Sequence, residues 1–309
     1  MIEINPFDKL RVNAEPSRSI KKVIIPIAGL GTRFLPLSKA VPKELWPLVD
    51  KPVIQYIVEE AKLSGISQII FVISPEKRII LDYFKESPAI EKILKERKRD
   101  YLLTELKSLK ELCQGLSFSY VFQKRPLGDG HAILQAKDKI NKDSTAVLFA
   151  DDVVAAKTPC LSQLLHVFKT CEKPVVALCR LPKERIPFYG AVAVEKIANR
   201  MYKIKKIIEK PTIEEAPSDL AIVGKYILTP EVFDYLAKSK PGKKGEIILG
   251  EVLDKMLKDG KIIYGYEFEG KWLECGNKFN WLQSHFYLSL RHEEYGPKLK
   301  KYLKEIKNL

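Results

Sequence analysis

The sequence has few cysteines, little glycine and no long apolar run. Its five cysteines are odd in number and no two lie closer than eight residues, which predicts neither a disulfide framework nor a paired-cysteine metal site. No apolar run approaches the roughly 18–20 residues of a membrane span. The polar segment 1–22 contains Pro6 and Pro16 and lacks the apolar core of a secretory signal. These absences predict a cytoplasmic protein without a membrane partner.

The composition is that of a globular protein with excess positive charge. Hydrophobic residues make up 46% and charged residues 30% of 309 residues, enough for one large domain or two ordinary ones. The net charge of +14 suits nucleic acid, an anionic membrane or a polyanionic small substrate. The basic segments 91–99 and 298–307 mix Glu and apolar positions with Lys, which predicts exposed helix faces. Because no basic stretch is interleaved with aromatic residues, nucleic-acid binding is the weakest alternative.

Apolar runs alternate with helical patterns in the first half of the chain. This alternation predicts βαβ units, and hence an α/β Rossmann-like fold with a mostly parallel mixed sheet flanked by helices. The second half has crowded strands before helices return, which predicts a more α+β part that shares the same sheet or core. The predicted strands are 23–28, 68–73, 118–122, 145–150, 175–180, 191–195 and 222–228, and the predicted helices are 53–64, 131–139, 246–258 and 277–290.

A glycine-containing loop follows the first predicted strand. Gly29 and Gly31 allow backbone N–H groups to approach phosphate oxygens, although Phe34 breaks the dinucleotide-binding fingerprint and no P-loop lysine follows. Three cations lie within fifteen residues: Arg33, Lys39 and Lys43. Several cations on a proline-stiffened loop suit a polyphosphate, whereas the alternative is an ordinary solvated basic loop.

Carboxylates follow a later apolar run. Asp151 and Asp152 come directly after residues 145–150, so they are expected at the carboxyl end of a parallel strand, where open α/β sheets bind ligands. Such a pair can hold Mg²⁺, or one Asp can simply cap the next turn. Farther along, Glu209-Lys210-Pro211 ends another strand-like run.

Five blocks of sequence carry a family resemblance. They are 29–45 (GLGTRFLPLSKAVPKEL), 48–56, 128–132, 209–211 with 219–224, and 275–278. From Lys22 to about Arg291 the chain resembles the sugar-1-phosphate nucleotidyltransferases, and in detail the bacterial UTP–glucose-1-phosphate uridylyltransferases. The resemblance implies a nucleotidyltransferase catalytic domain over 21–291, between a polar N-terminal extension (1–20) and a basic C-terminal helix (292–309).

The resemblance also implies roles for individual residues. Arg33 and Lys43 match catalytic cations on the triphosphate, and Asp151 and Glu274 match ligands of Mg²⁺. The nucleotide would be bound by Ala28, Gly29, Gly31, Thr32, Gln123 and Gly128, and the sugar phosphate by Gly190, Glu209, Lys210 and Val223. The implied reaction converts UTP and glucose 1-phosphate into UDP-glucose and pyrophosphate, in a homodimer or homotetramer.

The chain departs from the family pattern at three places. Glu274 stands where the family usually has Asp, segment 245–251 lacks a usual amide and hydroxyl, and Asp129 replaces an apolar residue. Two alternatives therefore stay open. One is a catalytically weak or inactive regulatory paralogue that binds a UDP-sugar, and the other is an enzyme for another nucleotide, such as dTTP.

Overall fold

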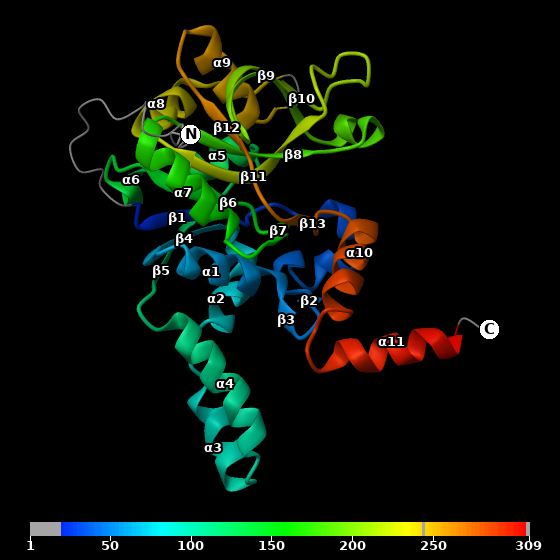
Figure 1. The fold of residues 1–309 in the computed structure, drawn as a ribbon. Coiled ribbons are helices and arrows are strands. Elements are labelled where there is room, and N and C mark those ends of the chain that lie inside the picture. The colour runs from blue at the N-terminus through cyan, green and yellow to red at the C-terminus, as the bar shows by residue number, and fades with distance from the viewer. Residues whose placement is uncertain (1–19, 243–244, 307–309) are drawn as a thin grey trace, which may run out of the picture.

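The computed structural model describes residues 20–242 and 245–306, and a nine-stranded sheet runs through the body (Figure 1). The expectation of an N-terminal extension over 1–20 falls almost entirely outside the described residues. The strands of this sheet are β5 (Ser117–Phe122), β4 (Gln68–Ile73), β1 (Lys22–Pro26), β6 (Thr145–Leu148), β11 (Leu220–Leu228), β8 (Val175–Arg180), β12 (Tyr264–Glu267), β10 (Met201–Glu209) and β9 (Gly190–Ala198), in spatial order.

The sheet is mixed, as predicted, and its two halves differ. β5, β4, β1 and β6 are parallel, whereas β11 is antiparallel to β6 and β8, and β10 is antiparallel to β12 and β9. Only β12 and β8 pair in parallel in the second half. Parallel pairing thus dominates the N-terminal half, and both halves share one sheet.

Pro26 ends β1 at a position where it costs no ladder hydrogen bond. β1 pairs with β6 only at Val23 and Ile24, so Pro26 lies beyond that pairing. On the other side, the next amide, that of Ile27, donates to Val72 O at 2.8 Å. A central strand can therefore end in proline, although proline has no N–H to donate.

Helices cover both faces of the sheet. α1 (Val53–Leu63) and α7 (Cys160–Cys171) pack on one face, and α5 (Asp129–Gln135), α8 (Pro230–Lys238) and α9 (Leu249–Lys258) pack on the other. α1 buries its apolar residues at helical spacing and ends at Leu63, two residues before Gly65, whose φ of 82° permits the helix stop that the sequence predicted. The remaining helices are α2 (Ile79–Tyr83), α3 (Pro88–Glu96), α4 (Asp100–Cys113), α6 (Lys137–Ile140), α10 (Lys278–Ser289) and α11 (Tyr295–Ile306).

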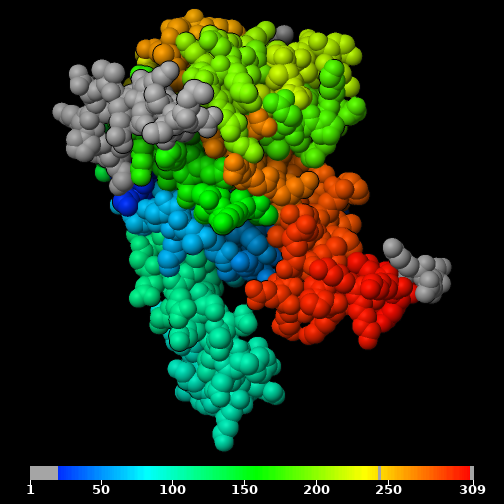
Figure 2. Space-filling view, viewed as in Figure 1, coloured from blue at the N-terminus to red at the C-terminus, as the bar shows by residue number. Residues whose placement is uncertain are grey.

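Two parts of the chain stand out from the body. α3 and α4 form an arm with no buried residue that extends downward in the view, and α11 projects at the lower right after α10 (Figures 1 and 2). Residues 91–96 of the first basic segment lie in α3, and residues 298–306 of the second lie in α11. No helix among the described residues is long and apolar enough to span a membrane.

Two short ladders outside the main sheet position the site. β2 (Pro47–Leu48) pairs with β3 (Lys51–Pro52). β7 (Asp152–Ala155) pairs antiparallel with β13 (Lys271–Glu274), which sets Glu274 opposite Asp152. The second ladder therefore joins residues more than a hundred positions apart at the end of β6.

Candidate active site

The loop after β1 forms one wall of a cavity of about 420 Å³, lined by Ala28, Gly29, Gly31 and Thr32 among others. Gly31 takes a φ of 66°, after which Thr32–Phe34 form a 3₁₀ turn. Phe34 is buried and packs edge-on against Trp46 at 4.7 Å between ring centroids. The aromatic anchor holds a loop whose backbone faces the cavity.

Two of the three predicted cations reach this cavity. Arg33 and Lys43 line it, whereas Lys39 is exposed outside it. Lys43 Nζ lies 2.5 Å from Asp151 Oδ2. Burial is the largest single influence on Lys43 and would lower its pKa, but the charges of Asp151 and Glu44 and the hydrogen bond to Asp151 together raise the pKa above its usual value. Burial would likewise raise the pKa of Asp151, and the charge of Lys43 keeps it below its usual range.

A buried ion pair beside Lys43 was not predicted from the sequence. Lys77 Nζ donates to both carboxylate oxygens of Glu44 at 3.0 and 2.9 Å, and both residues are at most 8% exposed. Glu44 lines the cavity and its charge helps to raise the pKa of Lys43. Lys77 follows β4, 33 positions away from Glu44, and no sequence signal links them.

Gln123 and Gly128 form the end of the cavity at α5. Gln123 Nε2 donates to Gly128 O at 2.9 Å and lies 3.0 Å from His131 Nδ1, so the amide is held in one orientation. Gly128 has a φ of 95°, and a Cβ there would lie 2.5 Å from Ile247 O. No other residue fits this position without moving the backbone.

The structure brings the two predicted metal ligands together. The Cys275 amide donates to Asp151 O at 2.7 Å, which continues the β7–β13 ladder to the acidic residues. A methyl group placed on Gly276 would lie 3.3 Å from Asp151 Oδ2 and 3.2 Å from Glu274 Oε1. The same position is 3.3 Å from Nη1 of Arg33. Two carboxylates and a guanidinium therefore converge on one point.

One oxygen of Glu274 is held by neighbours and the other faces that point. Oε2 accepts hydrogen bonds from the Tyr189 hydroxyl and the Asn280 side-chain amide, and Arg185 lies 3.4 Å away. Oε1 is the oxygen near Gly276. The longer Glu side chain thus reaches the site with its carboxylate already oriented.

Asp152 has a different environment from Asp151. Its carboxylate accepts from the Gly224 amide at 3.0 Å and from Trp272 Nε1 at 2.8 Å. Burial, together with the charge of Asp151, raises the pKa of Asp152 to about 7. Through these hydrogen bonds Asp152 connects β11 to β13. Among the described residues no group of three or more His, Cys, Asp or Glu side chains could hold a metal ion.

A second cavity of about 240 Å³ adjoins the first and is lined by Gly190, Glu209 and Lys210 among others. Glu209 ends β10, and Lys210 follows it with a φ of 49° while its amide donates to Tyr189 O at 3.1 Å. A left-handed conformation costs a non-glycine residue about 1–2 kcal/mol. This backbone turn places Glu209 and Lys210 in both cavities.

Val223 does not line the site. Its side chain is completely buried in the core, and its neighbours Ile222 and Gly224 line the second cavity instead. Successive residues of a strand point to opposite faces, so the prediction was displaced by one position along β11.

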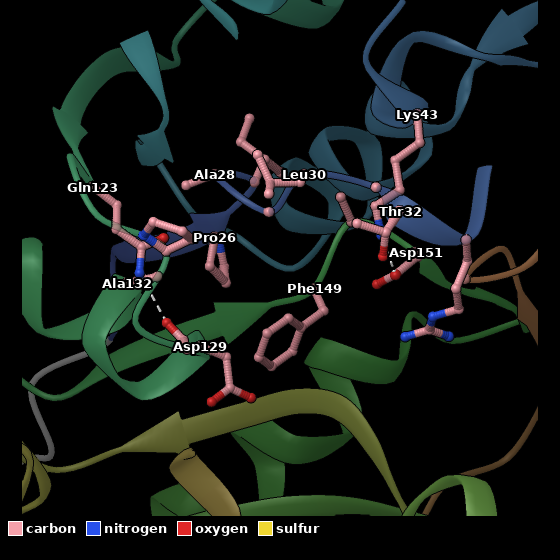
Figure 3. Close-up of a pocket in the computed structure, with 18 of the residues that line it drawn as sticks. Pro26, Ala28, Leu30, Thr32, Lys43, Gln123, Asp129, Ala132, Phe149 and Asp151 are labelled. Carbon is pink, nitrogen blue, oxygen red and sulfur yellow. Dashed lines mark hydrogen bonds and ion pairs between the residues drawn. The ribbon is translucent and has the colours of Figure 1, made fainter. Parts of the chain in front are cut away.

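The two cavities form one polar cleft. They share Arg33, Asp129, Phe149, Asp151, Glu209, Lys210 and Gly276. Figure 3 shows Phe149 and Asp129 on one side of the cavity and the loop of Ala28 and Leu30 on the other. The cations and the backbone N–H groups of the loop can bind a polyphosphate, and the two carboxylates suit a hard divalent cation. The ammonium of Lys210 can bind a second phosphate.

Comparison with protein families and solved structures supports this chemistry. The family model described as "Nucleotidyl transferase" matches residues 22–287. The chain is 40% identical over 289 residues to the UTP–glucose-1-phosphate uridylyltransferase of Staphylococcus haemolyticus, covering 94% of this chain and 99% of the relative. It is 38% identical over 291 residues to the Bacillus subtilis protein of that name, covering 94% and 98%.

Solved structures show the same relationship. A UDP-glucose pyrophosphorylase complexed with UDP-glucose matches with a TM-score of 0.80 and 37% identity, over 88% of this chain and 100% of the other. A UTP-bound UGPase from Acinetobacter baumannii matches with a TM-score of 0.85 and 34% identity, over 93% and 99%. The match extends over nearly the whole described fold.

Proposed function

This chain belongs to the nucleotidyl transferase family, and from that premise we propose that it transfers the uridylyl group of UTP to glucose 1-phosphate. The products are UDP-glucose and pyrophosphate. The observation that carries the proposal is the single cleft that joins the nucleotide loop, the Asp151–Glu274 pair and Lys210. Relatives that are named for this activity are about 40% identical to this chain, and the alignments cover nearly their full length.

The base and the triphosphate occupy the first cavity in this proposal. Gln123 has its amide nitrogen committed to Gly128 and His131, which directs its carbonyl oxygen as an acceptor for the uracil N–H. The backbone of residues 28–31 lies along the phosphates, since Ala28, Gly29 and Gly31 line the cavity with little or no side chain. Arg33 and Lys43 supply positive charge on the same side.

The reaction is an in-line displacement at the α-phosphorus. A phosphate oxygen of glucose 1-phosphate, held by Lys210, forms the new P–O bond while the bond to the β-phosphate bridging oxygen breaks and its electrons leave with pyrophosphate. No covalent enzyme intermediate forms. Arg33 and Lys43 meet the charge that grows on the leaving group, so catalysis consists of positioning and charge stabilisation.

Asp151 and Glu274 are the residues that would hold Mg²⁺. Mg²⁺ binds through one or two carboxylates together with phosphate oxygens and water, and this donor pair fits because Asp151 Oδ2 and Glu274 Oε1 face one point. When bound, Mg²⁺ supplies charge to the phosphate oxygens. Lys43 Nζ lies 2.5 Å from Asp151 Oδ2 and lines the same cavity, so its charge would be next to the triphosphate.

The proposal also includes a cytoplasmic location and assembly into a homodimer or homotetramer. All five cysteines are free thiols, which suits a reducing compartment. Phe279, Leu282 and Phe286 on α10 are 66%, 54% and 47% exposed, as expected of a surface that another copy covers. Sedimentation analysis of the purified chain tests the assembly, and a monomer at micromolar concentration contradicts it.

The reaction is tested by product analysis. Purified protein is incubated with UTP, glucose 1-phosphate and Mg²⁺, and the products are separated by chromatography and identified by mass. We expect UDP-glucose and pyrophosphate in equal amounts. Binding of UDP-glucose without formation of either product contradicts the proposal and favours a regulatory paralogue.

A further inference from the structure

Asp129 places a carboxylate in the wall of the cleft, and both of its hydrogen bonds from other described residues go to the same oxygen. Oδ1 accepts hydrogen bonds from the amides of Gly130 at 2.6 Å and Leu249 at 2.9 Å. It therefore ties the start of α5 to the start of α9. No hydrogen bond from another described residue reaches Oδ2. Because Asp129 lines both cavities, this oxygen can meet a ligand.

The contacts of Asp129 place it on the Glu209 side of the cleft. Leu249, its partner, precedes Gly250, and a Cβ on Gly250 would lie 3.2 Å from Glu209 Oε2. A Cβ on Gly190 would lie 3.1 Å from that same oxygen. Oε2 of Glu209 therefore lies against two residues without side chains, which positions this carboxylate between Gly190 and Gly250.

Tyr226 lines the second cavity together with Asp129 and Glu209. It is 7% exposed, and its pKa is raised well above the usual value by burial and by the charges of Asp129, Glu209 and Asp152. The two carboxylates of Asp129 and Glu209 therefore border one volume. Such a volume favours a neutral ligand with several hydroxyl donors, because a hydroxyl can satisfy an acceptor without adding a like charge.

We propose that Asp129 is a specificity-determining residue, and that its Oδ2 accepts a hydrogen bond from a hydroxyl of the hexose in the sugar phosphate. Glu209 accepts from another hydroxyl of the same ring. The inference rests on the proposed function, which supplies the hexose. A substrate without the matching hydroxyl leaves Asp129 unpaired inside the cleft, and such mismatches reduce kcat/KM by about ten- to hundredfold or more.

The test measures kcat/KM for glucose 1-phosphate and its 2-, 3-, 4- and 6-deoxy analogues with the wild type and Asp129→Asn. Asn keeps a carbonyl oxygen for the Gly130 and Leu249 amides but presents an NH₂ group to the ligand, which cannot accept. For the wild type we expect kcat/KM to be at least tenfold lower with one analogue, the one that lacks the hydroxyl bound by Asp129, than with glucose 1-phosphate. In Asp129→Asn, kcat/KM for glucose 1-phosphate itself should be lower by the same factor, and removing that hydroxyl from the substrate should lower it no further.

Glu209→Gln is the matched control, because this variant should no longer discriminate against a different deoxy analogue, the one that lacks the hydroxyl bound by Glu209. The KM for UTP should stay within twofold in Asp129→Asn. Equal selectivity in the variant and the wild type overturns the inference, and so does a wild type that discriminates against no deoxy analogue, even if the variant fails to fold. The inference is also overturned if Asp129 governs discrimination against 2′-deoxy-UTP and not against a deoxyhexose analogue, because Oδ2 then faces the ribose.

Binding separates this inference from the proposed reaction. If the wild type releases no pyrophosphate, the reaction fails, and calorimetric titration with UDP-glucose and its deoxyhexose analogues still tests Asp129. A weaker affinity of the wild type for one analogue, absent in Asp129→Asn, supports the inference independently of turnover. Equal affinities of the wild type for all of them refute it.

Discussion

Replacement of Glu274 by Gln isolates the oxygen that faces Asp151. In the structure Glu274 Oε2 accepts from Tyr189 and Asn280, whereas Oε1 faces the point near Gly276. The Gln carbonyl oxygen can take over both hydrogen bonds. Its NH₂ group then replaces Oε1, and an amide nitrogen does not ligate Mg²⁺. We therefore expect the fold to survive and the metal site to lose a ligand.

The magnitude follows from that single exchange. Loss of one charge-stabilising group in a preorganised site costs about 3–4 kcal/mol, or roughly 10²–10³ in kcat. The hydrogen bonds at the other oxygen are retained, so the free energy of unfolding should change by less than about 1 kcal/mol. Glu274→Asp keeps the charge and should retain measurable activity at a higher Mg²⁺ concentration.

The assay is the initial rate of pyrophosphate release at several Mg²⁺ concentrations, with unfolding in urea measured on the same samples. Tyr189→Phe is the control, because it removes one hydrogen bond to Oε2 but leaves both carboxylate oxygens. It should lose no more than about tenfold. Glu274→Gln activity within threefold of the wild type, with the same Mg²⁺ dependence, would refute Glu274 as a ligand.

Three further changes test other parts of the site and fold. Arg33→Ala should lower kcat by about 10²–10³, because Arg33 meets charge that develops on the leaving pyrophosphate; a change confined to the KM for UTP contradicts this. Lys210→Ala should raise the KM for glucose 1-phosphate at least tenfold more than that for UTP, and equal effects on both substrates argue against its placement. Lys225→Met leaves the Glu60 carboxylate buried without its partner at 2.7 Å and should destabilise the fold by about 3–5 kcal/mol in urea. Adding Glu60→Gln should restore at least half of that loss, and a single-variant effect below 1 kcal/mol contradicts it.

Local patterns were enough to predict much of the sheet. The predicted strands 68–73 and 175–180 coincide with β4 and β8, because short apolar runs bounded by polar residues leave few alternatives. The glycine loop and the acidic residues after β6 were also located from the sequence. Both features belong to strand ends, where chain direction and side-chain type are set locally.

Contacts between distant segments could not be predicted in this way. The β7–β13 ladder, the Glu44–Lys77 pair and the open oxygen of Asp129 each depend on how separate elements pack. Val223 shows a second limit: an error of one residue on a strand moves a side chain from the cleft to the core. The location of most strands was thus predictable, and the face toward which the Val223 side chain points was not.

Initial rates of pyrophosphate release across nucleoside triphosphates test the central claim most directly. Purified protein is assayed with UTP, dTTP, CTP, ATP and GTP, each with glucose 1-phosphate and Mg²⁺, and again with excess EDTA. We predict the highest kcat/KM for UTP and loss of activity when EDTA removes Mg²⁺. No pyrophosphate from any triphosphate, or a clear preference for another nucleotide, would contradict the account.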